Sequence, residues 1–498
     1  MGTGFYLTVM IAYSAVMIGI GVALQKQANK SMDDFGIASN RFGATVLAIV
    51  SIGAWVGSGG LIGLASSGYS DGVMGYWEYA MGYISMLPFI FLFVTRIKFL
   101  KLFTIPDFFA LRYSKYGEAI RYPTGVIYMV RNATVLGMQL NALAFLFTAF
   151  FELDHVLGVL LASAIVVIYT AMSGFLSVMI TNVIQSIFQT ITPFVAFFFI
   201  IKLAGGWSNI SEYYMDIDLS GNLSLFNNLD WIGAVIYYAF TVGLFYIIAD
   251  QGDWQRIGAA KNAKIARNSL LFGTIAVLPI LILPCYIGAG ARFVMGEGIA
   301  PNLVFYELIK LGGPVMSAVL LVGALSTIMS CTSTYLFAGG MNLSHDVIVQ
   351  FLKSRGKTID DKKEIFYSKV GIALCCGVGI LFALKVQGLI ALWSAGLSIC
   401  ASGLIVPFLF AWFNKKSNTE SALAGMIAGG IVAFVWTMLD NPFGLDPIWI
   451  GLPVSIIACT ITPLFTPKPS EQEVEATYYF NDKFKKAARD IEHDSEVR

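Results

Sequence analysis

Apolar segments of about 20 residues recur along almost the whole chain, and they constrain its fold more than any other feature. A helix needs about 20 mostly apolar residues to cross a bilayer core, and in lipid a helix satisfies its own backbone hydrogen bonds. Only 13% of the residues are charged, whereas soluble domains carry about 25%. The sequence therefore predicts an all-α integral membrane protein.

Thirteen segments meet this length criterion, and each is predicted to be one transmembrane helix. The first lacks the basic start and the small-residue cleavage site of a signal peptide, so we expect it to be retained. The thirteen segments are 3–25, 42–68, 73–96, 120–150, 155–173, 178–204, 230–250, 268–290, 315–345, 366–384, 387–413, 421–438 and 447–465.

Basic residues gather in alternate loops, which predicts the orientation in the cell membrane. Lys and Arg in loops mark the cytoplasmic side, and thirteen spans place every basic loop on that side. The N-terminus is then outside and the C-terminus inside. The membrane domain covers 1–466, and 467–498 is expected to be a polar cytoplasmic tail with a short amphipathic helix. The basic loops are 26–41, 96–121, 251–267, 352–369 and 413–418.

Net charge and motifs exclude several classes of function. A net charge of +1 leaves no basic surface for nucleic acid. The chain has no HExxH or GxSxG motif and no paired intramembrane aspartates, which argues against an enzyme. It also lacks an output domain, so a solute sensor ranks below a transporter. The expected partners are the lipid bilayer and a small-molecule solute, with no obligate protein partner evident.

Four glycines crowd into the middle of the second span. Such a cluster indicates either close helix packing by small residues or an unwound helix whose free carbonyls coordinate a cation. Five spans later, a second interruption is predicted around Thr241–Gly243, where an inverted repeat would place its partner. The paired interruptions favour a binding site near the membrane midplane. The four glycines are Gly57, Gly59, Gly60 and Gly63.

Polar groups inside predicted spans are costly and therefore informative. Arg131 and Glu78 either pair with neighbouring polar groups or contribute to a site, and a buried arginine suits a carboxylate. In the ninth span, Thr327, Ser330 and Thr334 recur at helical spacing and share one face. Their hydroxyls either bond their own helix or offer hard oxygen ligands to sodium.

Four segments, taken in order, resemble the sodium/solute symporter family. They are GAWVGSGGLIG at 53–63, TNVIQ at 181–185, DQGDWQR at 250–256 and the hydroxyl-rich ninth span ending at Asp346. The resemblance covers about 5–465. It implies the leucine-transporter fold, a five-plus-five inverted repeat with core repeats at about 42–204 and 230–413. One extra helix would precede this core and two would follow it.

The resemblance also implies an ion site and a solute site. The family's main sodium site falls on the carbonyls of Gly53 and Val56, and the facing helix supplies the carbonyl of Thr327, the hydroxyl of Ser330 and position 331. The solute is expected near Gly60, Glu78, Arg131 and Tyr246. Tyr246 matches a gating aromatic residue, and Arg131 matches the position at which sialic acid transporters hold a carboxylate.

Two positions depart from the family pattern where ion coupling is expected. Cys331 replaces a Ser or Thr, and a thiol is a poor ligand for a hard cation. Asn182 replaces an aspartate and removes a charge tied to coupling. The leading hypothesis is uptake of a small, anionic organic solute with Na⁺ by alternating access. The alternatives are a sodium-independent or proton-coupled carrier on the same fold, or a sensor.

Overall fold

The computed structural model describes residues 2–28, 43–100, 102, 104–172, 175–226 and 231–477. Within these ranges the regular secondary structure is helical, joined by turns and irregular segments, and there is no β-strand. The all-α fold predicted from the apolar periodicity is therefore confirmed.

Nine helical segments of the described chain are long and apolar enough to cross a membrane, each at a predicted position. Two bent helix pairs and two shorter apolar helices occupy the other four predicted positions. The transmembrane character of these four stays a prediction. The nine are Thr3–Ala23, Ala44–Ser70, Gly117–Phe151, Ser177–Leu203, Ala263–Met295, Pro314–Ser354, Asp361–Lys385, Leu389–Phe413 and Thr419–Met438; the four are Val73–Leu92 with Val94–Leu100, Trp231–Tyr246 with Gln251–Ala259, His155–Val167 and Ile448–Leu464.

Helices of very different length build the bundle. The first half holds α1 (Thr3–Ala28), α3 (Ala44–Ser58), α4 (Leu64–Ser70), α5 (Tyr76–Ser85), α6 (Leu87–Leu92), α7 (Val94–Leu100), α8 (Ile105–Arg112), α9 (Arg121–Phe151), α10 (His155–Met172), α11 (Phe175–Leu203) and α12 (Trp207–Asp216). The second half holds α13 (Trp231–Tyr238), α14 (Leu244–Tyr246), α15 (Gln251–Ala259), α16 (Ala263–Met295), α17 (Val304–Lys310), α18 (Pro314–Leu343), α19 (Gln350–Ser354), α20 (Asp361–Lys385), α21 (Leu389–Phe413), α22 (Thr419–Met438), α23 (Ile448–Ile461) and α24 (Glu471–Thr477).

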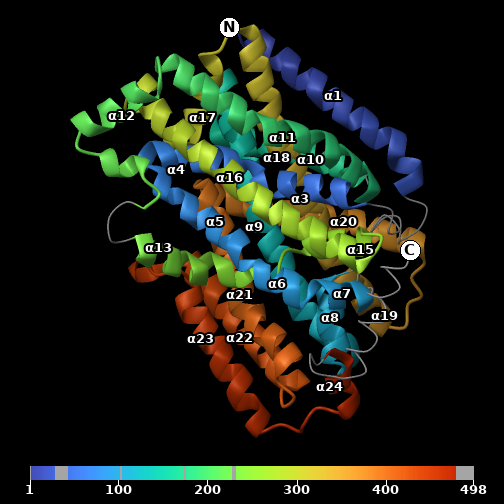
Figure 1. The fold of residues 1–498 in the computed structure, drawn as a ribbon. Coiled ribbons are helices and arrows are strands. Elements are labelled where there is room, and N and C mark those ends of the chain that lie inside the picture. The colour runs from blue at the N-terminus through green and yellow to red at the C-terminus, as the bar shows by residue number, and fades with distance from the viewer. Residues whose placement is uncertain are drawn as a thin grey trace.

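Helix α9 packs against four other long helices, α10, α18, α20 and α21. Helix α3 packs against α11, α16 and α18. In Figure 1, α1 runs along one edge of the molecule, whereas α22 and α23 lie together at another edge beside α21. Helix α3, which is interrupted at Gly57, thus lies among the long helices α11, α16 and α18.

Small residues let α4 and α16 touch through their backbones. A Cβ added at Gly288 would lie 2.0 Å from the carbonyl oxygen of Ala65, and one at Gly68 would lie 2.1 Å from that of Cys285. Such approach is typical of helix packing inside membranes, where apolar side chains gain little by leaving lipid.

The first part of the predicted tail forms a short helix, α24, that docks on the bundle. The carboxylate of Glu473 accepts hydrogen bonds from the backbone N–H of Lys115 and the hydroxyl of Thr419, both at 3.1 Å. The rest of the tail, 478–498, lies outside the described residues.

Candidate functional site

The first interrupted helix breaks at Gly57, in the predicted glycine cluster. Its backbone angles are φ 45° and ψ 178°, a conformation that only glycine adopts readily. Side chains from other helices bind the carbonyls just before it: the Tyr83 hydroxyl donates to Trp55 O at 2.8 Å, and the Cys331 thiol donates to Ala54 O at 3.2 Å. A π-helical segment over residues 59–63 follows.

The second interrupted helix is also π-helical at the predicted position, Ala239–Gly243. The full break comes a few residues later, after Tyr246, where the chain turns by 49° before α15. Ala249 there has φ 64°, and its carbonyl accepts a hydrogen bond from Tyr128 at 3.2 Å. The Trp254 indole donates to Ile248 O at 2.8 Å. Both predicted interruptions are confirmed, and the second extends further than the sequence indicated.

Direct contacts join the two interrupted helices. The indole N–H of Trp55, in α3, donates to Asp253 Oδ1 at 3.2 Å. Asp250 caps the N-terminus of α15 together with Asp253. Tyr83 of α5 adds an indirect link: its hydroxyl donates to Trp55 O at 2.8 Å, and its ring lies 5.3 Å from that of Tyr246. The two breaks therefore form one site and not two separate irregularities.

The hydroxyl face of α18 meets Asn182 of α11. Ser330 donates to Asn182 Oδ1 at 3.0 Å, and Asn182 Nδ2 donates to the Thr334 hydroxyl at 3.0 Å. The Thr327 hydroxyl instead bonds the carbonyl of Gly323 in its own helix at 2.8 Å. The structure thus brings Asn182 to Ser330, next to the residue, Cys331, that inserts into the first break.

The two predicted ion positions on α3 lie deep in the bundle. A Cβ at Gly53 would lie 2.0 Å from Ser186 Oγ and 2.2 Å from Gln189 Oε1, so this backbone contacts α11 closely. Val56 is fully buried. Since α3 also packs against α18, the two helices expected to share an ion are neighbours.

Arg131 forms a buried ion pair, one of the two alternatives that the sequence left open, but its partner, Asp250, was not predicted. Its Nη2 lies 2.9 Å from Asp250 Oδ1 and 3.0 Å from Oδ2. The guanidinium sits 4.9 Å from the ring of Phe245 and 5.0 Å from that of Tyr335. Its Nε and Nη1 have no hydrogen-bond partner among the described residues. Intramembrane charges tend to pair, and that rule applied to Asp250 was the available signal.

Two other predicted solute contacts, Tyr246 and Gly60, border one aromatic cluster, because Tyr79 beside Gly60 stacks on Trp393 at 4.1 Å. Tyr246 is buried in an aromatic cluster that includes Tyr83 and, at 6.4 Å, Trp393. Gly60 faces α16, because a Cβ added there would lie 2.8 Å from Leu281 Cδ2 and 3.6 Å from Tyr79 Cε1.

Glu78 occupies a different environment from Arg131. It is only partly buried and lies within electrostatic range of Asp446 and Tyr238. Asp446 precedes α23, and its Oδ1 accepts a hydrogen bond from Ser398 at 2.6 Å. The structure therefore gives Glu78 and Arg131 different interaction partners.

A second charged cluster lies where α9 begins. Arg121 pairs with Asp107 and, at 3.2 Å, with Asp346, which also accepts a hydrogen bond from Thr104 at 2.9 Å. Ligand atoms of Asp107, His345 and Asp346 lie within 4.8 Å of one another, but Arg121 bonds both carboxylates. Burial alone would raise the pKa of Asp107; the Arg121 and His345 charges hold it below its ordinary value.

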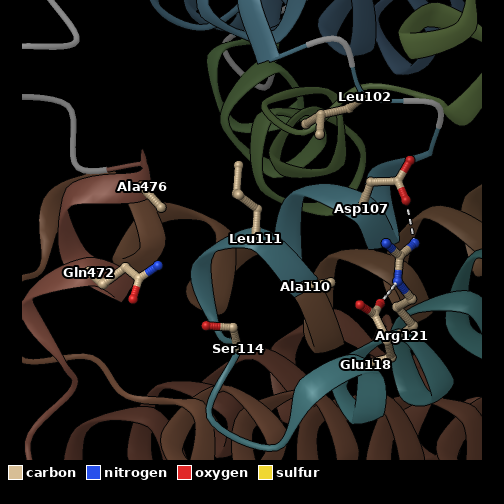
Figure 2. Close-up of a pocket in the computed structure, with 9 residues that line it drawn as sticks. All are labelled: Leu102, Asp107, Ala110, Leu111, Ser114, Glu118, Arg121, Gln472 and Ala476. Atoms are coloured by element: carbon tan, nitrogen blue, oxygen red, sulfur yellow. Dashed lines mark hydrogen bonds and ion pairs between the residues drawn. The ribbon is translucent and has the colours of Figure 1, made fainter. Parts of the chain in front are cut away.

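A pocket of about 540 Å³ opens beside this cluster (Figure 2). Arg121, with its ion pairs to Asp107 and Glu118, lies on one side, and Gln472 and Ala476 of α24 lie on the other. Arg121 precedes Arg131 by ten residues, about 15 Å along α9. The pocket is therefore separate from the helix breaks. Its lining residues are Leu102, Asp107, Ala110, Leu111, Ser114, Glu118, Arg121, Gln472 and Ala476.

Comparisons with known proteins agree with this architecture. Residues 35–429 match the Sodium:solute symporter family. The sodium/proline symporter of Staphylococcus aureus (strain JH9) is 26% identical over 491 residues, which cover 93% of each chain. A Na⁺-coupled sialic acid symporter in a substrate-bound, outward-open state superposes with a TM-score of 0.76 at 20% identity, covering 94% of this chain and 98% of the other. A nucleobase-cation-symport-1 family transporter superposes with a TM-score of 0.57 at 15% identity, covering 90% and 98%.

The structural neighbours share the leucine-transporter fold, which confirms the predicted fold class, whereas the count of thirteen helices and the bounds of the two repeats stay predictions. The relatives are transporters and not enzymes, as the absence of catalytic motifs indicated. With apolar helices long enough to cross a bilayer and a family match over most of its length, the chain belongs to the sodium:solute symporter family and is a multi-pass membrane transporter.

Proposed function

We propose that this protein imports a small organic solute together with Na⁺ by alternating access. One observation carries the proposal: two interrupted helices are joined by the Trp55–Asp253 hydrogen bond, and α3 and α15 both pack against α18. Interrupted helices expose backbone dipoles inside the membrane, where they bind ions and polar solutes. The family match supports sodium as the coupling ion.

For the ion, we assign the backbone carbonyls of Gly53 and Val56 and, on α18, the carbonyl of Thr327, the Ser330 hydroxyl and Cys331. Hard oxygen ligands suit Na⁺ better than a thiol does, so Cys331 is the weak member of this set. Asn182 adjusts the site through its hydrogen bond with Ser330. Coupling follows if the ion binds one conformation of the carrier more tightly than the other.

For the solute, we assign Gly60, Arg131 and Tyr246 as the central contacts and Glu78 as a peripheral one. An anionic solute fits because Arg131 keeps two N–H donors, at Nε and Nη1, without partners among the described residues. Asp250 balances the arginine charge from within the protein. The likeness to sialic acid and proline symporters supports an organic acid.

Uptake into proteoliposomes tests both parts of the proposal. An inward sodium gradient is expected to drive accumulation of a carboxylate, and carboxylates are expected to compete better than their neutral amides. Equal flux with potassium on both sides would reject sodium coupling. Equal competition by acid and amide would reject the anionic solute and leave the sodium result standing.

The rival is a sodium-independent or proton-coupled carrier, which Cys331 favours because its thiol bonds Ala54 O at 3.2 Å. Replacing Cys331 by Ser supplies a hard oxygen at this position. We expect sodium to stimulate uptake more strongly, so that the sodium concentration that gives half-maximal uptake falls several-fold. Cys459→Ser is the control and should change nothing, because this buried cysteine of α23 faces Ser421 of α22. Unchanged sodium dependence in Cys331→Ser would count against ion binding at this position.

The proposed orientation places the N-terminus outside and the C-terminus in the cytoplasm, as the basic loops indicate. Reporter fusions at the two ends are expected to lie on opposite faces of the membrane. Reporters on the same face would require an even number of spans.

A further inference from the structure

The side chain of Gln139, on α9, is buried with its hydrogen-bonding capacity unused. Its exposure is 0%, and neither Nε2 nor Oε1 has a hydrogen-bond partner among the residues that the structure describes. A carboxamide removed from water without partners is destabilising, and buried polar groups in native proteins normally have a protein, water or ligand partner. Gln139 therefore calls for a partner that is not part of the described chain.

Gln139 faces the break in the first interrupted helix. A Cβ added at Gly57 would lie 3.8 Å from Gln139 Nε2 and 3.1 Å from Cys331 Sγ, and one at Gly59 would lie 1.8 Å from the Tyr79 hydroxyl oxygen and 3.1 Å from Met138 Sδ. The hydroxyl of Ser58, the residue that follows Gly57, is also buried without a partner in the described chain. Two unpaired polar groups, an amide and a hydroxyl, thus belong to the same break.

We propose that Gln139 and Ser58 form a solute subsite that binds a neutral hydroxyl or amide group. The amide itself argues against an ion as the occupant. A cation would bind only the amide oxygen and leave both N–H donors unpaired, whereas a hydroxyl or an amide donates to the oxygen and accepts from the nitrogen. This holds whichever way the carboxamide is turned.

The subsite extends the proposed function, on which it rests. Gln139 follows Arg131 by eight residues, about 12 Å along the helix axis. The solute that fits both positions carries a carboxylate at one end and hydroxyl or amide groups towards the other. Hydroxylated or N-acylated organic acids have this chemistry, and plain fatty acids lack it.

Thermal melting of the full-length protein in detergent tests the subsite. The probes are N-acetylneuraminic acid, gluconate and hexanoate; the last two are six-carbon carboxylates that differ in their hydroxyl groups. The variants are Gln139→Met, which keeps the side-chain length, and Ser58→Ala. Leu146→Met, at a buried apolar position of α9, is the control. Each is measured in sodium and in potassium.

We expect a hydroxylated acid to raise the melting temperature of the wild type more than hexanoate does. In Gln139→Met this preference is lost, with the half-maximal concentration raised roughly tenfold or more, while the ligand-free protein melts at the same temperature or higher. Ser58→Ala is expected to reduce the preference for the hydroxylated acid over hexanoate. This variant serves as the test of the subsite if Gln139→Met does not fold.

Three results would overturn the subsite: a preference retained in both variants, a lower melting temperature of ligand-free Gln139→Met in a protein that still folds, or no stabilisation of the wild type by either hydroxylated acid. A preference that depends on Gln139 but is equal in sodium and potassium, with no sodium-driven uptake, would overturn sodium coupling and leave the subsite standing.

Discussion

Replacing Asp250 by Asn is expected to lower the free energy of unfolding by about 3–5 kcal/mol and to abolish uptake. In the wild type, the Asp250 carboxylate lies 2.9 Å from the guanidinium of Arg131. The substitution keeps the shape of the side chain but leaves this guanidinium charged, fully buried and without a carboxylate partner. An arginine cannot give up its proton to escape this cost. The measurement is the melting temperature of the purified protein, together with uptake in proteoliposomes.

A double replacement separates the structural cost from the functional one. Arg131→Met with Asp250→Asn removes both charges, so no buried charge is left without a counter-charge, and asparagine still caps the N-terminus of α15. The double variant should therefore melt close to the wild type and still fail to transport an anionic solute. An Asp250→Asn variant as stable as the wild type would mean that Arg131 has another counter-charge, and the assigned pair would be wrong.

Gly57→Ala is expected to destabilise the protein by about 1–3 kcal/mol, because a residue with a Cβ is forced into backbone angles that glycine alone tolerates. The added methyl group would also press on Cys331 Sγ at 3.1 Å. If the backbone relieved this strain by continuing the α-helix through residue 57, the interruption that forms part of the site would be lost. We therefore expect uptake to fall with stability, measured in the same two assays.

Gly377→Ala in α20 is the matched control. This glycine has open space around its Cβ position and shows no positive φ. Alanine in a helix interior is more favourable than glycine by up to about 1 kcal/mol, so this variant should melt at the same temperature or higher and transport normally. If the two variants behaved alike, the conformation of Gly57 would not be a requirement of the site.

The order and position of the helices could be predicted because lipid leaves a chain few ways to satisfy its backbone. Glycine density located the first break, since a positive φ in mid-helix requires this residue. The second break ends at Ala249, whose φ of 64° is rare outside glycine, and no local pattern predicts that. Interruption could therefore be predicted, but its full extent could not.

Partner choice was beyond the sequence because it depends on contacts between distant segments. Arg131 and Asp250 are 119 positions apart, and Cys331 and Ala54 are 277 apart. The sequence singled out Arg131 and Cys331 but neither of their partners, and it left open whether Arg131 pairs with a neighbouring polar group or binds a solute. For Gln139, the sequence shows an amide within a long helix but does not show whether that amide has hydrogen-bond partners.

The hydrogen bond between Trp55 and Asp253 has a mechanical consequence. It couples the segment before the first break to the helix that follows the second, so neither can swing outward alone without breaking it. Any movement that separates the two segments therefore loses a hydrogen bond to a carboxylate, which contributes about 1.5–3 kcal/mol. In the proposed cycle of sodium-coupled import, this bond favours states in which both segments move together over states in which one moves alone.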